Sequence, residues 1–273
     1  MMRWIARTFL GVFAVGWFCS AYVYLKSQQT INRSHVPEPR RVALVSGDDI
    51  QSEGARLSKV FGCVSCHGDR MQGQVLYEHA LNGRITAPNL TQKASNLTLN
   101  EIEAVLRQGI KPDGSSVFVM PSASFSALTD RDFSAIYSHL LQLTSEGNAP
   151  KPTDYGLLTR YRIVRGQLPA AAEQRLTQPW RDTFRDSPRR LGEYLATVSC
   201  SQCHGSDLQG IDTLAPALGR LSNYDRVEFS ELLTKGIAPA GREVAMKADL
   251  AAQRYRFLRA EEVDAIYEYL KQR

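Results

Sequence analysis

The same five-residue pattern, Cys-x-x-Cys-His, occurs twice in this chain of 273 residues and constrains it more than any other feature. The copies are Cys63-Val64-Ser65-Cys66-His67 and Cys200-Ser201-Gln202-Cys203-His204. The pattern is the attachment signature of haem c, because its spacing lets two thiols reach two vinyl groups of one porphyrin while the histidine reaches the iron. The sequence therefore predicts two covalently bound haem c groups. Cys63, Cys66, Cys200 and Cys203 would attach them, and His67 and His204 would be iron ligands.

Zinc binding and thiol redox chemistry are the two other uses of such cysteines. The motifs contain four of the five cysteines, and only Cys19 is left, so we expect neither a disulfide framework nor a four-cysteine zinc site. Redox-active Cys-x-x-Cys pairs do not require a histidine at the next position. Haem attachment is therefore the favoured interpretation of both motifs.

Segments that follow the two motifs also resemble each other. Ala-Pro-Asn-Leu at 87–90 corresponds to Ala-Pro-Ala-Leu at 215–218, and Ala-Ile-Tyr occurs both at 135–137 and at 265–267. The spacing between equivalent segments shortens toward the end of the chain, so the second copy has lost loop residues. Repetition of this kind indicates repeated structural units. The sequence predicts two haem domains, at 51–145 and 188–273.

Both copies contain signals for helices. Thr98-Leu99-Asn100-Glu101 is a capping box, and an apolar stripe of Ile102, Val105 and Leu106 follows it and ends at Gly109. Further helix starts are predicted at 129–132 and 222–225. No alternating strand pattern bounded by hairpin signals competes with the helices. The predicted fold class is all-α, with an amino-terminal transmembrane helix before the two haem domains.

The amino-terminal segment predicts a membrane helix. Arg3 and Arg7 precede a run from Thr8 to Leu25 that contains no charged residue and is long enough for a short membrane span. The alternative is a signal peptide that is cleaved after Ala21. Because the apolar run continues past that point, residues 1–26 are interpreted as an uncleaved anchor. Its amino end would stay in the cytoplasm, and the rest of the chain would be exported.

Two segments connect the anchor and the predicted domains. Residues 27–50 form a polar tether that contains prolines. Residues 146–187 form an arginine-rich connector whose Trp180 and Phe184 indicate that it packs on something. It is either a strap over the domains or a surface for a partner. Outside this connector the net charge of +5 is scattered, with no basic stripe interleaved with aromatic residues, so no nucleic-acid binding is predicted.

The second axial position of each iron decides between electron transfer and catalysis, because a methionine there raises the reduction potential and blocks substrate access. Met120 lies in a predicted loop between the two helices that follow the first motif, and Met246 lies in the equivalent loop of the second copy. We predict that these two methionines are the sixth ligands. His79 and His139 are alternatives at the first iron, and Lys247 is the alternative at the second.

The order of these motifs resembles the class I cytochrome c family. In this chain the order is Cys-x-x-Cys-His-Gly, Ala-Pro-Asn-Leu-Thr, a glycine-terminated helix with Asp-Gly after it, Met-Pro, Leu-Thr-Asp-x-Asp and Ala-Ile-Tyr. It is most similar to the membrane-associated cytochrome subunits of periplasmic alcohol and sugar dehydrogenases. The resemblance covers 51–145 well and both ends of the second copy. Those subunits usually carry three haems, whereas two motifs occur here, and Lys247 follows Met246 where a proline follows Met120.

This resemblance implies an electron-transfer protein and not an enzyme. It would be a single-pass protein of the bacterial inner membrane, with haem domains in the periplasm. They would relay single electrons between a periplasmic donor, either a dehydrogenase or a quinol-oxidising complex, and a respiratory acceptor. One alternative is a dihaem subunit of a cbb-type terminal oxidase. Another is a dihaem peroxidase or a thiosulfate dehydrogenase, which would need an exchangeable or non-methionine ligand at one iron.

Overall fold

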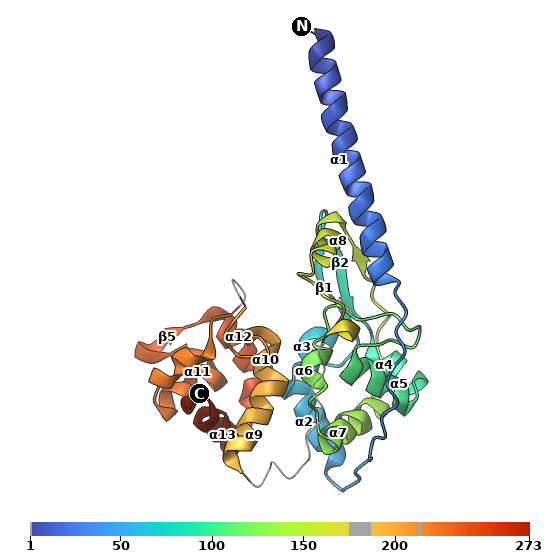
Figure 1. Cartoon of the computed structure of the whole chain (residues 1–273). Helices are drawn as coiled ribbons and strands as arrows, with labels where there is room; N and C mark the ends of the chain where they lie inside the picture. Colours follow the sequence, from blue (N-terminus) through green and yellow to red (C-terminus); the bar gives the residue numbers. More distant parts are fainter. Residues whose placement is uncertain (1, 175–186, 212–214) are drawn as a thin grey trace.

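The structure, a computed structural model, describes residues 2–174, 187–211 and 215–273. A long helix, α1 (Met2–Ile31), projects from a body made of two lobes (Figure 1). This helix continues past residue 26, where the anchor was expected to end, and residues 33–47 after it have no regular secondary structure. The first lobe follows this segment, and the second lobe comes last in the chain.

Short helices joined by turns build the first lobe. They are α2 (Ile50–Val60), α3 (Cys63–His67), α4 (Leu90–Lys93), α5 (Leu99–Glu103), α6 (Ser122–Phe125) and α7 (Asp130–Leu141). The predicted capping box is confirmed: the Thr98 side chain accepts from the Glu101 N–H, and the Glu101 carboxylate accepts from the Thr98 N–H. A π-helical turn, Ala104–Gln108, extends α5, and Gly109 ends it with a left-handed φ of 71°. Thr129 caps α7, as predicted.

The second lobe repeats this plan. Its helices are α9 (Pro188–Leu195), α10 (Ser201–His204), α11 (Arg226–Lys235), α12 (Ala245–Gln253) and α13 (Ala260–Lys271). Asp225 starts α11 through a capping box with Glu228, at the last residue of the segment that predicted this helix start. Gly236 then ends α11 with a φ of 75°, as Gly109 does in the first lobe.

In each lobe the first helix crosses the last one at a glycine. α2 crosses α7 where Gly54 lies against the backbone of Ala135, and α9 crosses α13 where Gly192 lies against the backbone of Ala265. The approach is so close that a Cβ on either glycine would be 1.9 Å from the carbonyl oxygen of the facing alanine. The same crossing therefore holds together both copies of the repeat.

A small sheet corrects the expectation of an all-α fold. β1 (Gln74–His79), β2 (Gly83–Ala87) and β3 (Asp154–Tyr155) form an antiparallel sheet in that order, and β4 (Ile237–Ala238) pairs with β5 (Arg242–Glu243) in the second lobe. Ala80-Leu81-Asn82 makes the turn between β1 and β2, and Gly83, the first residue of β2, has the positive φ, 77°, that suits the residue after such a three-residue turn. β1 does not bury one face, so its residues lack the alternation that normally reveals a strand.

The connector between the lobes lies on the first lobe over its described part. β3 extends the hairpin, and α8 (Leu157–Val164) packs along the end of α1 that is nearest to the body (Figure 1). Trp180 and Phe184, which the sequence suggested as packing residues, lie outside the described part of the chain.

Candidate haem sites

The first motif forms one helical turn, α3, directly after α2. Gly62 precedes it with a φ of 82°, which lets the chain leave one helix and start the next. Cys63 and Cys66 are three residues apart on this turn, so their side chains lie on one face. His67 follows, and its Nδ1 donates to the carbonyl oxygen of Pro88 at 2.8 Å. Because Nδ1 carries the proton, Nε2 is left as the nitrogen that can bind a metal.

The second motif has the same arrangement. His204 is buried, and its Nδ1 donates to the carbonyl oxygen of Pro216 at 2.7 Å. Pro88 and Pro216 belong to the Ala-Pro segments that match between the two copies. Sequence reasoning noticed this match but gave the prolines no role. The structure assigns them one, because each carbonyl orients the histidine of its own motif.

Burial controls the protonation of the first motif. It lowers the pKa of His67, against a smaller opposite effect of the hydrogen bond to Pro88, and so favours the neutral imidazole that binds metals. Burial also raises the pKa of the Cys63 thiol to about 11 and raises that of Cys66. Both thiols of the polypeptide are therefore neutral at pH 7.

The residues around His204 have the chemistry that a haem site needs. They enclose a small apolar cavity whose lining consists of Cys200, His204, Leu218, Leu221, Phe229, Leu233, Tyr255, Ile266 and Leu270. Apolar walls suit the faces of a porphyrin, and one ring nitrogen suits its iron. When bound, the haem supplies one-electron iron chemistry. The protein residues would hold it through Cys200 and Cys203, ligate it through His204 and keep water away from it.

The structure places the two candidate methionines differently. Met120 is half-buried against the apolar core, in a bend just before α6. Ser122 ties this bend to the preceding helix, because its hydroxyl donates to the carbonyl oxygen of Val105 at 2.9 Å. Met246 lies in the first turn of α12, not in the expected loop, and its side chain lies outside what the structure describes. The segment from Ala245 contains strong helix formers and no proline, whereas Pro121 interrupts the chain directly after Met120.

The two motifs meet at the interface between the lobes. Gln202 Nε2 donates to the carbonyl oxygen of Phe61 at 3.2 Å, and the hydroxyls of Ser124 and Ser201 are 2.8 Å apart. The Cys203 thiol acts electrostatically on Cys66, in the direction that raises its pKa. Buried apolar side chains of both lobes form one continuous core. The haem sites therefore adjoin each other, which no local pattern in the sequence indicated.

The cytochrome c family profile matches residues 51–144 and 190–273, once around each motif. The chain belongs to the cytochrome c family. Membership implies covalently bound haem c, which agrees with the motif geometry. The two family matches also agree with the repeated crossing of the first and last helices, α2 with α7 and α9 with α13.

Two dehydrogenase subunits are similar to this cytochrome. The "Fructose dehydrogenase cytochrome subunit" of Gluconobacter japonicus is 27% identical over 252 residues, which cover 81% of this chain and 52% of that protein. The cytochrome c subunit of "Alcohol dehydrogenase (quinone)" from Gluconobacter oxydans (strain 621H) is 26% identical over 200 residues, which cover 69% of this chain and 40% of that protein. The cytochrome thus spans about half the length of the curated relatives it matches. These matches confirm the predicted resemblance and support an electron-transfer component, not an enzyme.

The structure also places the alternative ligands of this cytochrome. His79 ends the exposed strand β1, where its ring stacks on Tyr77 at 6.3 Å and its Nδ1 accepts from the Leu81 N–H at 3.3 Å. His139 lies on α7 at the crossing with α2, where its Cβ faces Gly54. Neither contact involves α3. The side chain of Lys247, like that of Met246, is outside the described part of the second lobe.

A buried arginine lies between the two haem motifs of the cytochrome. Arg254, only 4% exposed, donates from Nε to the carbonyl oxygen of Val60 at 3.2 Å and from Nη2 to the hydroxyl of Ser199 at 3.1 Å. Its charge lowers the pKa of Cys63 and of Cys66, against the larger effect of burial. Sequence reasoning missed this residue, because its partners are distant along the chain.

Proposed function

We propose that this cytochrome is a membrane-anchored, dihaem electron-transfer subunit that works with a periplasmic dehydrogenase. One haem would be attached at Cys63 and Cys66 with His67 and Met120 as iron ligands. The other would be attached at Cys200 and Cys203 with His204 and Met246. Single electrons would pass from the dehydrogenase through both haems to a respiratory acceptor, with no bond made or broken at either iron.

One observation carries the dihaem proposal. Both motifs end in a histidine whose Nδ1 is bonded to a proline carbonyl, which presents Nε2 of each histidine in the same way. The adjoining motifs favour electron exchange between the two sites. The dehydrogenase as partner is supported by the names of the relatives, and copurification from native membranes tests it.

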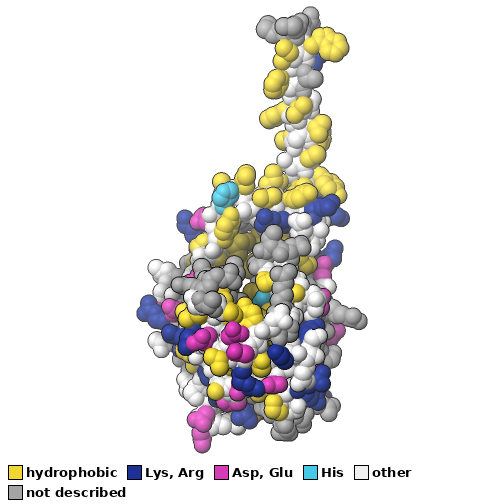
Figure 2. Space-filling view, turned by 90° about the vertical axis from the view of Figure 1, so that its left-hand side faces the viewer, with side chains coloured by type: hydrophobic (Ala, Val, Ile, Leu, Met, Phe, Trp, Pro, Cys, Tyr) yellow, Lys and Arg dark blue, Asp and Glu magenta, His cyan; other side chains and the backbone are white. Residues whose placement is uncertain are grey.

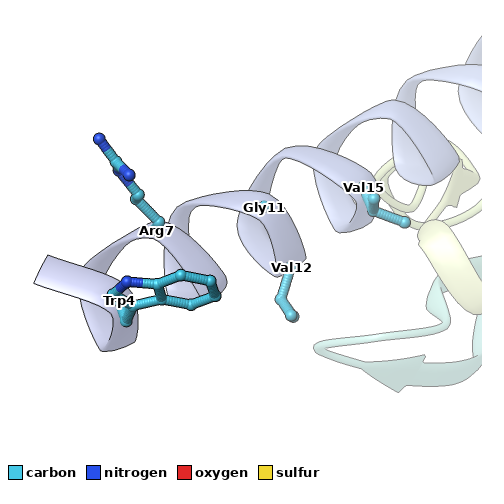
Figure 3. Close-up of a pocket in the computed structure, with 5 residues that line it drawn as sticks. All are labelled: Trp4, Arg7, Gly11, Val12 and Val15. Carbon is cyan, nitrogen blue, oxygen red and sulfur yellow. The ribbon is translucent and has the colours of Figure 1, made fainter. Parts of the chain in front are cut away.

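The anchor proposal rests on α1. Among the described residues, Phe9–Ile31 is the one helical stretch long and apolar enough to cross a membrane, with a mean hydropathy of 1.4. Its side chains are exposed over most of its length, as a span facing lipid requires. The exposed surface of this helix has an open notch at Gly11, which has no side chain (Figure 3). The notch is lined by Trp4, Arg7, Gly11, Val12 and Val15.

The intact mass of the purified protein tests the dihaem state and the anchor together. We expect the mass of the full chain plus two haems, because both motifs are complete and α1 is interpreted as uncleaved. One haem per chain would contradict the dihaem proposal. A mass that lacks the residues up to Ala21 would show that the segment is a signal peptide.

Replacing the proposed sixth ligands tests the coordination. Oxidised haem with methionine as a ligand has a sulfur-to-iron charge-transfer band in the far red. We expect Met120→Ala to remove about half of this band and Met246→Ala to remove the other half, because each variant takes the sulfur from one iron. Met71→Leu is the control, since Met71 is buried at the position that Leu208 has in the second lobe. An unchanged band in Met120→Ala would rule out that ligand.

A further inference from the structure

The body of the cytochrome covers α1 before the uncharged run of that helix ends. Arg160 of α8 lies over the ring of Tyr24, 4.3 Å from its centroid. Its Nη1 donates to the hydroxyl of Ser27 at 3.0 Å and to the side-chain oxygen of Gln28 at 2.9 Å. Ser27 is fully buried, and the partial covering of the helix begins at Ser20.

The uncharged part of α1 that is free of the body is too short to cross a bilayer. The uncharged residues from Thr8 to Cys19 provide roughly 18 Å of helix at about 1.5 Å per residue. The hydrocarbon core of a bilayer is about 30 Å thick. The missing length has to come from residues that lie beside the body. If α1 spans a membrane, as the proposed function holds, this end of the body therefore reaches the bilayer surface.

The β1–β2 hairpin and the amino end of α8 form this end of the body (Figure 1). The Leu158 N–H donates to the carbonyl oxygen of Leu81 at 3.0 Å, so the hairpin turn and the start of α8 are joined. At the other end of α8, Ile163 shares a small apolar core with Ile31, the last residue of α1. The amino end of α8, with Leu157, therefore points toward the bilayer.

Four of the exposed side chains at this end are apolar. We call them the apolar rim, which consists of Leu81 (61% exposed), Leu157 (45%), Leu158 (39%) and Tyr161 (44%). Figure 2 shows hydrophobic side chains gathered where α1 leaves the body, with Lys and Arg side chains at the same level. Arg162 is exposed farther along α8, and Arg165 is exposed directly after its end. An apolar edge followed by basic side chains matches the interface of a bilayer with anionic headgroups.

We propose that the apolar rim inserts into the interface of an anionic bilayer and forms a second membrane contact beside α1. A single helix would let the body rotate and tilt on the membrane. A second contact fixes that orientation, because the rim and α1 are joined through Arg160. The first haem site would then face the membrane at a constant height and angle.

Thiol accessibility in lipid nanodiscs tests this contact with the full-length holoprotein, in which the four motif cysteines are blocked as thioethers. The discs contain phosphatidylcholine and phosphatidylglycerol. Leu81→Cys, Leu157→Cys and Val227→Cys are each made in a Cys19→Ser background, which alone reports unspecific labelling. Val227 is the matched control, because it is 68% exposed on α11 of the second lobe. Each variant reacts with a charged maleimide that stays in water and with a small uncharged one that enters the bilayer.

We expect the charged reagent to label Leu81→Cys and Leu157→Cys at least tenfold more slowly than Val227→Cys, while the uncharged reagent shows a smaller difference, because it reaches the bilayer although a thiol there is less ionised. The native Cys19, in the middle of α1, should resist the charged reagent as well. Equal labelling of rim and control with Cys19 still protected would overturn the rim contact but leave the anchor standing. Rapid labelling of Cys19 would overturn the anchor and the rim contact with it.

Discussion

One added methyl group at Gly54 or Gly192 is expected to destabilise the lobe that contains it by about 3 kcal/mol or more. A Cβ at either position would be 1.9 Å from a carbonyl oxygen, of Ala135 in the first case and of Ala265 in the second. The contact is with backbone and not with the end of a flexible side chain, so no rotamer change relieves it. Helix propensity works in the opposite direction, because alanine in a helix is about 1 kcal/mol better than glycine. The clash is the larger effect.

Gly16→Ala is the matched control for this prediction. Gly16 also lies in a helix, α1, and a Cβ added there meets nothing within 4 Å. Denaturant unfolding followed by circular dichroism should give a lower midpoint for Gly54→Ala and Gly192→Ala than for the wild type, and an unchanged midpoint for Gly16→Ala. Haem content per chain should fall in the two crossing variants. The prediction is wrong if all three variants unfold together with the wild type.

Local patterns in the sequence were sufficient for much of the fold. The caps at Thr98 and Thr129 and the stops at Gly109 and Gly236 depend on residues within one turn of each other, so the sequence alone predicted them. The Cys-x-x-Cys-His motif is equally local. The β1–β2 hairpin was missed although Gly83 after Asn82 is a typical hairpin signal, because apolar and polar residues do not alternate along β1.

The connections between the haem motifs depend on distant residues and were not predictable. The carbonyl of Pro88 reaches His67 across 21 positions, and Arg254 reaches Val60 across 194. A sequence comparison marked the repeated Ala-Pro pair as similar, but only the fold brings its carbonyl to the histidine. The prediction of a loop at Met246 was wrong for a local reason, because the residues around Met246 favour a helix.

The buried charge of Arg254 is expected to raise the reduction potentials of both haems. Arg254 bonds to Val60, just before the first motif, and to Ser199, which precedes Cys200 of the second. Ferrous haem carries one positive charge fewer than ferric haem, so a nearby cation favours the reduced state. A unit charge about 10 Å from an iron contributes on the order of 1.7 kcal/mol at an effective dielectric constant of about 20. That free energy corresponds to roughly 70 mV for a one-electron couple.

Arg254→Gln should therefore lower both potentials by about 40–80 mV, because it removes the charge and keeps a group that can bond to Val60. Arg256→Gln is the matched control, since Arg256 is two residues away but exposed, where solvent screens its charge. Arg254→Lys keeps the charge and should restore most of the shift. Redox titration followed by the absorbance of the reduced haems measures all three variants. Equal shifts for Arg254→Gln and Arg256→Gln would show that burial between the motifs gives Arg254 no special influence. A shift at one haem alone would place its charge beside that site and not between the two.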